Sequence, residues 1–334
     1  MPIDADLPVF DSLTGPWTGI LIGNGASRAV SSGFAYQSLF TVAQQASLSN
    51  PLTVNGVSLF EAFDTTNFER VLSYLISARL INGILGVDIG PISTAYQSVR
   101  TALIQAVHAV HIQWEAIPED TLLKIRAALK SYKFVYSTNY DLIAYWAVMK
   151  DQTGFVDYFF GPLFDASNTE VWGEDVTRLM FLHGALHLCR TNRGTLKRAG
   201  SWGGNILETF GDPVPDYPSA VPLFVSEGSS ENKLASIRSN DYLSFVYGEF
   251  VSHSGGLVIV GQSLEPAHDQ HLINAIRGRR GRRLAVAIYR GSRTDIEIMN
   301  EKTSWLARFD GYDFSIDFFD STTHPLGAPD LFVY

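Results

Sequence analysis

Short apolar runs that stop abruptly at glycine or polar residues are the feature of this sequence that most restricts its fold. One of five such runs, 178–182 (RLMFL), ends at His183-Gly184. Helical patterns follow most of the runs, which is typical of an α/β fold with a Rossmann-like, doubly wound parallel sheet. The other four runs are also predicted to be buried parallel strands: 18–22 (TGILI), 133–137 (KFVYS), 256–261 (GLVIVG) and 284–289 (LAVAIY).

A long helical insertion, residues 36–130, separates the first two predicted strands. Apolar residues at three- or four-residue steps predict one amphipathic helix over 94–116. The region 58–80 is predicted to be helical as well, with a break near residues 64–66. The stripe of the first helix comprises Tyr96, Val99, Leu103, Val107, Val110 and Trp114, and that of the second comprises Phe68, Val71, Leu72 and Leu75.

The composition of the remaining chain indicates a second insertion and the bounds of the main domain. Residues 190–240 are rich in Gly, Pro, Ser and Asn and are expected to be a loop-rich insertion. The Rossmann-like domain would then comprise residues 18–35 and 131–320, followed by a C-terminal tail over 321–334.

Composition limits the partners of the chain. The 334 residues are 46% hydrophobic and 18% charged, which is enough apolar material for a substantial core and argues against disorder. The net charge of −9 disfavours general binding to the nucleic-acid backbone, so no direct nucleic-acid contact is expected. The arginine-rich run 277–283 (RGRRGRR) is interpreted as a solvated loop between helix and strand, with phosphate contact as the alternative.

Cysteine content and the N-terminus restrict the class of protein further. Cys189 is the only cysteine, so an intramolecular disulfide and a cysteine-based zinc site are excluded. The first residues lack the basic and apolar regions of a signal peptide. No apolar run approaches the roughly 18 residues that a membrane span requires. We therefore expect a cytoplasmic protein with no membrane association.

Polar or glycine-rich clusters follow the predicted strands, where ligands bind in open α/β sheets. The first cluster is Gly23, Asn24, Gly25, Ala26 and Ser27. A strand that feeds a glycine turn and a helix start is a ready anion site. The dinucleotide fingerprint G-x-G-x-x-G would place a third glycine at position 28, where this chain has Arg28.

The second cluster, residues 137–141 (STNYD), offers two side chains that could bind a ligand. The Asn139 amide can both donate and accept, which suits a water molecule or a ribose hydroxyl. Asp141 could accept from a ribose hydroxyl or from Asn139. The alternative is a helix N-cap, since these residue types favour that position.

The third cluster contains His183, followed by Gly184. A neutral histidine at a strand end is interpreted as a general base, because its ordinary pKa suits proton removal near neutral pH. A metal site with His187, four residues on, is disfavoured because Gly184 makes a helix doubtful there and no carboxylate lies close in sequence. His187 is interpreted as a packed structural histidine.

The fourth cluster lies within residues 258–276. Gly261 allows close backbone approach, and Ser263 can donate to a phosphate or a ribose. Asp269 is placed in the first turn of the following helix, where a carboxylate suits the helix dipole. His268 and His271 are equally consistent with surface residues and with ligands. There is neither a G-x-S-x-G nucleophile elbow nor a G-x-x-x-x-G-K-[ST] phosphate loop.

Taken in order, these four clusters resemble the motifs that line the NAD pocket of the sirtuin superfamily. The family's G-A-G-x-S turn matches residues 23–27, its T-x-N-x-D segment matches Thr138 to Asp141, its H-G dipeptide is His183-Gly184, and its G-[TS]-S turn matches residues 261–264. The run 67–72 (NFERVL) also resembles a segment of the bacterial sirtuin-like branch. The resemblance covers residues 20 to about 275.

Two departures from that family separate the chain from protein deacylases. The zinc ribbon with four cysteines is missing, so no zinc is expected, and the family's S-x-x-x-G-x-P-D-F-R stretch is replaced by RAVSSGFAYQSL after Ser27. Zinc-less bacterial sirtuin-like proteins are often NAD-consuming enzymes of phage defence.

The resemblance implies an NAD+ glycohydrolase with NAD as its substrate. Asn139 would hold the water or ribose hydroxyls, His183 would accept the proton, and Asp141 would fix the loop. Residues 23–27, Thr138, Gly261, Ser263 and Asp269 would bind the dinucleotide, with Ser27 starting the helix and touching phosphate. The alternatives are an NAD or ADP-ribose sensor without turnover and, less favoured, a deacylase. A homo-oligomer or a regulatory partner protein is compatible with each.

Overall fold

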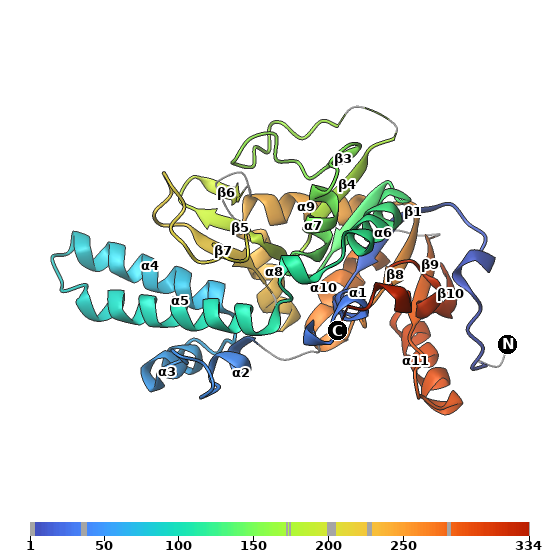
Figure 1. Ribbon diagram of the computed structural model, residues 1–334, viewed down its shortest axis with the longest axis horizontal. Helices are drawn as coiled ribbons and strands as arrows, with labels where there is room; N and C mark the ends of the chain where they lie inside the picture. Colours follow the sequence, from blue (N-terminus) through green and yellow to red (C-terminus); the bar gives the residue numbers. More distant parts are fainter. Residues whose placement is uncertain are drawn as a thin grey trace.

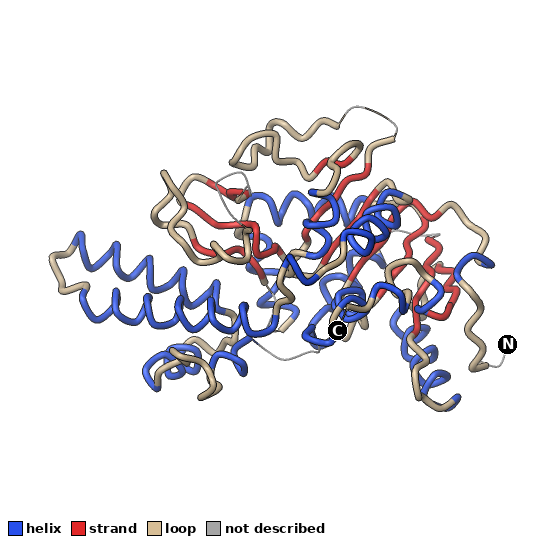
Figure 2. The backbone as a smooth tube through the Cα atoms, in the orientation of Figure 1, coloured by secondary structure: helices blue, strands red, loops and turns tan. Residues whose placement is uncertain are grey.

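A seven-stranded parallel sheet forms the centre of the molecule (Figures 1 and 2). The computed structural model describes residues 4–34, 39–171, 173, 175–198, 205–225, 229–278 and 282–333. Within these residues the strand order is β10-β9-β8-β1-β2-β4-β3. The strands are β1 (Trp17–Ile22), β2 (Phe134–Ser137), β3 (Phe155–Val156), β4 (Thr177–Phe181), β8 (Gly256–Val260), β9 (Arg282–Ile288) and β10 (Phe314–Asp320).

Helices cover both faces of this sheet, as the alternation of side chains along its strands shows. Tyr136 on β2 packs on Phe250 of α9 (Asp241–Ser252), with ring centroids 4.8 Å apart. Leu21, its register partner on β1, points the same way, so the next residue, Ile22, points to the opposite face. There Ile22 shares a cavity with Ile125 of α6 (Glu119–Lys130). The predicted Rossmann-like, doubly wound α/β fold is therefore confirmed.

The chain reverses its direction across the sheet between β1 and β8. From β1 it moves outward to β2, β4 and β3, and it later returns to place β8 on the other side of β1. In open α/β sheets the crevice beyond the carboxyl ends of the strands at such a reversal is the usual ligand site. The turn after β1 and the turn after β8 consequently face each other at the switch point.

Helical elements occupy the first insertion, and its longest part is an antiparallel helical hairpin. The predicted break near residues 64–66 is confirmed, since it lies between α3 (Val54–Ala62) and α4 (Phe68–Ile84). The predicted helix over 94–116 is shorter: α5 (Gly90–Val110) ends at Val110, and Trp114 lies in a 3-10 turn. The helix stops because His111 turns extended and accepts a hydrogen bond from the backbone N–H of Leu142.

The expectation of a loop-rich segment over 190–240 is wrong in part. A second, antiparallel sheet begins just before it and extends into it, with β5 (Gly184–Thr191), β6 (Gly194–Lys197) and β7 (Val221–Phe224) in the order β6-β5-β7. The helix α8 (Ser230–Arg238) then follows. Polar residues dominate this region, yet long-range backbone pairing and buried side chains such as Leu196 still form a sheet.

The remaining helices beside the sheet are α1 (Asn24–Val30), α7 (Ile143–Met149), α10 (Pro266–Arg277) and α11 (Asp295–Arg308). Helix α2 (Leu39–Ala43) packs against α5 in the first insertion. Residues after β10 pack against α1, where the N–H of Val333 donates to the carbonyl of Val30 at 2.8 Å. No helix among the described residues is long and apolar enough to cross a membrane.

Several sequence predictions fall partly outside the described residues. They are the boundary at 35–38, positions 199–204 and 226–228 of the loop-rich segment, positions 279–281 of the arginine-rich run, and Tyr334. On either side of 279–281, α10 ends at Arg277 and β9 begins at Arg282.

Gly184, directly after His183, provides a test of the fold around the site. It has φ +72°, and a Cβ there would collide with the carbonyl oxygen of Leu223. We expect Gly184→Ala to lower the free energy of unfolding by more than about 2 kcal/mol, measured by urea denaturation. The control Gly311→Ala has φ +77° but open space around it, so it should lose only about 1 kcal/mol from the backbone term. Equal losses in both variants would contradict this account.

Candidate functional site

The two turns at the switch point touch each other through glycine. The N–H of Gly25 donates to the carbonyl of Gly261 at 2.8 Å. A Cβ on Gly25 would lie only 2.6 Å from the Cα of Gly261, and Gly261 itself has φ +70°. Neither position accepts a side chain without displacing the other turn. The glycines of these two clusters are therefore explained by mutual packing as well as by access for a ligand.

The turn after β1 differs from the prediction in where its helix begins. Helix α1 starts at Asn24, with Gly23 as its N-cap, so Ser27 lies inside the helix rather than at its start. The N–H groups of Gly25 and Ala26 already donate to protein carbonyls, those of Gly261 and Gly23. These two donors are thus engaged within the protein, and they do not form a ready phosphate cradle in this conformation.

Ser27, Asn139 and Asp141 form one buried hydrogen-bonded group, which we call the Ser–Asn–Asp network. The Asn139 amide donates to the Ser27 hydroxyl at 2.8 Å and to the carbonyl of Gly23 at 3.0 Å. The Ser27 hydroxyl in turn donates to Asp141 Oδ2 at 2.5 Å. Side chains from the ends of two neighbouring strands, β1 and β2, are thereby held in a fixed arrangement.

Asp141 accepts hydrogen bonds from two different helices, and its predicted partner Asn139 binds it only through Ser27. Its Oδ1 accepts from the N–H of Ile143 at 2.9 Å, at the first residue of α7. This is the helix-terminus role of a short polar side chain. Its other oxygen binds Ser27, so one carboxylate both starts a helix and orders the network.

A small cavity of about 20 Å³ lies against the Ser–Asn–Asp network. A space of this size holds about one water molecule. Asn139, Asp141 and Ser27 supply its polar wall, and Ile22, Ala26, Ile125, Leu129, Ile143, Ala144, Leu326 and Leu331 supply the apolar remainder. Part of the C-terminal tail therefore closes this cavity.

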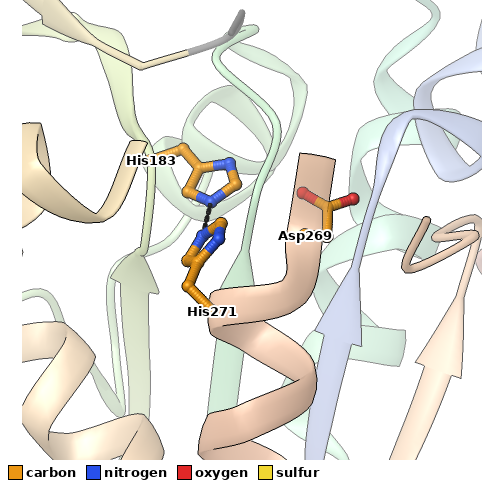
Figure 3. Close-up of side chains that lie close together, drawn as sticks. All are labelled: His183, Asp269 and His271. Atoms are coloured by element: carbon orange, nitrogen blue, oxygen red, sulfur yellow. Dashed lines mark hydrogen bonds between the residues drawn. The ribbon is translucent and has the colours of Figure 1, made fainter. Parts of the chain in front are cut away.

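His183, which follows β4, faces His271 of α10 in the buried interior. Their Nε2 atoms lie 3.0 Å apart, and Figure 3 shows the two imidazoles meeting edge to edge. The Nδ1 of His271 lies 2.9 Å from the Ser230 hydroxyl of α8, which also accepts from the N–H of His271. The three side chains form a hydrogen-bonded relay, Ser230–His271–His183.

Asp269 lies beside this relay, in the first turn of α10 as predicted, with non-helical backbone at φ −130°. Its Oδ1 accepts from the Lys233 ammonium at 3.1 Å and its Oδ2 from the Gln262 amide at 3.3 Å. Both Lys233 and Asp269 are buried. Gln262 belongs to the turn after β8, so this ion pair joins α8 and α10 to the switch-point crevice.

The ligand atoms of His183, Asp269 and His271 lie within 4.8 Å of one another, so these three residues could hold a metal ion. Their hydrogen bonds argue for a different use. The Lys233 ammonium already neutralises Asp269, and a divalent cation placed here would meet that positive charge at close range. We therefore interpret the group as an ion pair beside a histidine relay.

Burial keeps both histidines of the relay neutral. Burial is the largest cause that lowers the pKa of His183 well below its ordinary value, and Lys233 and His271 add to it. Burial, with a further contribution from Lys233, lowers the pKa of His271 to about 3. Both imidazoles are therefore unprotonated at neutral pH, but the lowered pKa makes His183 a weaker base than the ordinary histidine pKa on which its predicted general-base role depended.

The remaining predicted site residues lie at the same edge but make different contacts. The Asn24 amide donates to the carbonyl of Phe34, and the Thr138 hydroxyl to the carbonyl of Ile22. Ser263 is exposed. His187 is buried in β5 and stacked on Tyr145 at 4.3 Å, which confirms its structural role.

Sequence reasoning missed two members of the site, Ser230 and Lys233, and left a third, His271, open between a surface residue and a ligand. His271 could be read as a surface residue, but it is buried, whereas His268 is exposed. Ser230 and Lys233 lie on α8, in the segment expected to be loops. The helix-capping Ser229, whose side chain accepts from the N–H of Asn232, was the available signal for that helix.

Comparison with known proteins identifies a family but no activity. A family model described as a domain of unknown function (DUF4917) matches residues 20–326, and the chain therefore belongs to that family. No curated protein matches the chain.

The buried neutral histidines predict a loss of stability in mild acid. Burial lowers the pKa of His271 to about 3 and those of His253 and His324 to about 4, whereas unfolded histidines titrate near 6.5. The unfolded chain therefore binds more protons below pH 6.5, and stability falls as the pH drops from 6.5 toward 4. Each such histidine contributes about 1.4 kcal/mol per pH unit in this range.

Urea denaturation at pH 7.5, 6.5, 5.5 and 5.0 measures this slope. Replacing His324 by phenylalanine should reduce the dependence of the free energy of unfolding on pH by the contribution of one histidine, about 1.4 kcal/mol per pH unit. A free energy of unfolding that stays constant from pH 7.5 to 5.0 would contradict the prediction.

Proposed function

We propose that this DUF4917 protein is a sirtuin-like NAD+ glycohydrolase that cleaves the bond between nicotinamide and ribose. The observation that carries the proposal is that Asn139 of the Ser–Asn–Asp network and His183 of the Ser230–His271–His183 relay follow neighbouring strands of one parallel sheet. Asn139 follows β2 and His183 follows β4, and the N–H of Leu182 donates to the carbonyl of Ser137. Both groups adjoin the crevice at the switch point, the usual ligand site of such sheets.

The reaction requires little acid catalysis. The C–N bond to the positively charged nicotinamide breaks with its electron pair leaving on nitrogen, so nicotinamide departs neutral. Water attacks the oxocarbenium-like ribose carbon and gives up one proton, and the products are nicotinamide, ADP-ribose and H⁺. The protein must therefore position the water and accept a proton, as in glycoside hydrolysis.

The hydrogen bonds suggest a division of labour. In one proton arrangement, His183 donates from Nε2 to His271, and His271 donates from Nδ1 to Ser230. In this arrangement Nδ1 is the unprotonated ring nitrogen of His183, so it is the atom that would accept the proton of the water. Asn139 would hold the water or the ribose hydroxyls, and Asp141 would keep Asn139 in place through Ser27.

A nucleotide sensor without turnover is the second candidate, and one observation favours it. The N–H groups of Gly25 and Ala26 are engaged within the protein, and His183 is buried. Catalysis would require the two switch-point turns to separate, whereas a sensor could respond to that separation itself. Turnover therefore distinguishes the two candidates.

The direct test is to incubate the purified full chain with NAD+ and to measure nicotinamide release by chromatography. We expect turnover in the wild type, and a loss of at least about a hundredfold in Asn139→Ala and in His183→Ala. His268→Ala, a change at an exposed position of α10, should keep wild-type activity. Binding of NAD+ without release would support the sensor, and absence of binding would overturn both candidates.

His271 is a positioning residue in this scheme. We expect His271→Ala to lower kcat by roughly ten- to a hundredfold with little change in KM, because the base loses its orientation but substrate contacts remain. His271→Gln can still accept from His183, so it should recover part of kcat. A purely structural role would instead lower the folded fraction of both variants without splitting kcat from KM.

A further inference from the structure

The buried side chain of His111 connects the helical insertion to the candidate site. It directly follows α5, the second helix of the hairpin. Its Nε2 accepts from the backbone N–H of Leu142 at 3.0 Å, and its Nδ1 lies 2.7 Å from the carbonyl oxygen of Ile112. Leu142 is the N-cap residue of α7 and the next residue after Asp141. The end of α5 therefore contacts the segment that carries Asn139 and Asp141.

These two contacts determine where the His111 ring carries its proton. A backbone N–H can only donate, so Nε2 holds the lone pair, and the proton of the neutral imidazole lies on Nδ1 and is donated to the Ile112 carbonyl. Burial lowers the pKa of His111 below its ordinary value, although Asp141 acts in the opposite direction. A protonated ring would place two N–H donors against each other. The ring is thus a neutral acceptor for Leu142.

Two aromatic side chains hold the His111 ring in this orientation. Phe34 and Trp146 each meet it edge to face, with ring centroids 5.1 Å away. Such contacts between aromatic rings have a preferred geometry. Trp146 belongs to α7, and the carbonyl of Phe34 accepts from the Asn24 amide at the start of α1. The ring is therefore packed between the chain segments that follow β1 and β2.

Leu142 ends a short segment whose other polar side chains are held by α1. Asn139 and Asp141 both bind Ser27, as described above. Without His111 the buried N–H of Leu142 would lose its partner, and an unsatisfied buried donor is costly. The segment would then shift toward another acceptor, and Asn139 would move with it.

We propose that His111 is a positioning residue that couples the α4–α5 hairpin (Figure 1) to the candidate site; its effect on turnover rests on the proposed function. A displacement of α5 moves the acceptor of the Leu142 N–H, and through it the start of α7 and Asn139. Since Asn139 would hold the water or the ribose hydroxyls, small displacements matter. A shift of about 1 Å in a reacting group costs roughly a hundredfold in rate.

Two substitutions separate the hydrogen bond of His111 from its packing. His111→Phe keeps a flat ring between Phe34 and Trp146 but removes the acceptor. His111→Gln loses the ring but keeps an acceptor oxygen that reaches as far as Nε2. His108→Phe is the matched control, because His108 lies one turn earlier and its Nε2 contacts the carbonyl of Leu207, outside the candidate site.

Amide hydrogen exchange of the full chain, measured by NMR, tests the coupling without a substrate. In His111→Phe the N–H of Leu142 should exchange at least about tenfold faster. The N–H of Ile143 should follow it, although it donates to Asp141 and not to His111. His111→Gln and His108→Phe should stay close to the wild type at both positions. Unchanged exchange at Ile143 in His111→Phe would overturn the coupling.

Nicotinamide release from NAD+ tests the consequence for turnover, at a temperature where urea denaturation shows every variant to be folded. His111→Phe should lower kcat roughly tenfold with KM changed less than about threefold, and His111→Gln should recover most of kcat. His108→Phe should keep the wild-type kcat. A wild-type kcat in His111→Phe, or equal losses in both His111 variants, would overturn the positioning role.

The two measurements distinguish failure of this proposal from failure of the proposed function. A wild type that releases no nicotinamide would overturn the glycohydrolase activity. The exchange rates at Leu142 and Ile143 would then still support or overturn the coupling between the hairpin and the segment that carries Asn139, because they require no turnover.

Discussion

The contact between Gly25 and Gly261 is the constraint on which the rest of the candidate site depends. It closes the crevice between β1 and β8, and it fixes where the helix after β1 can begin. Once α1 starts at Asn24, Ser27 faces inward and can join Asn139 to Asp141. Any larger side chain at either glycine would separate the turns and move this hydrogen-bonded network as a unit.

The second half of the site is organised by one buried charge pair. Lys233 and Asp269 compensate each other, which makes burial of both tolerable, and the ammonium also disfavours protonation of the nearby histidines. A kinked first turn of α10 brings His271 and Asp269 to the same side as His183. The contact between the two histidines and the position of the ion pair thus both depend on one local distortion.

Much of the sheet could be predicted from sequence, because buried parallel strands leave uninterrupted apolar runs such as residues 256–260. The edge strands could not. In β10 the apolar run is interrupted by Ser315 and Asp317, which an edge position tolerates, and β3 is only two residues long.

The polar residues at the strand ends were predictable for a related reason: parallel strands bring their carboxyl ends to one edge. The pairing of His183 with His271 was not predictable. It depends on the irregular first turn of α10 and on the packing of α8, and both elements lie far from His183 in the sequence. The early start of α1 was missed because Gly23 and Asn24 suggest a longer turn than the contact with Gly261 allows.

The C-terminal tail has a consequence for the order in which the protein can be completed. Leu326 and Leu331 form part of the wall around the cavity beside Ser27, and Val333 pairs with Val30 at the end of α1. The surroundings of Ser27 therefore depend on a segment that is synthesised much later than β1 and α1. A nascent chain can assemble its first strands while this pocket is still open to water, and the pocket acquires its final shape only after residues 326–333 have been added.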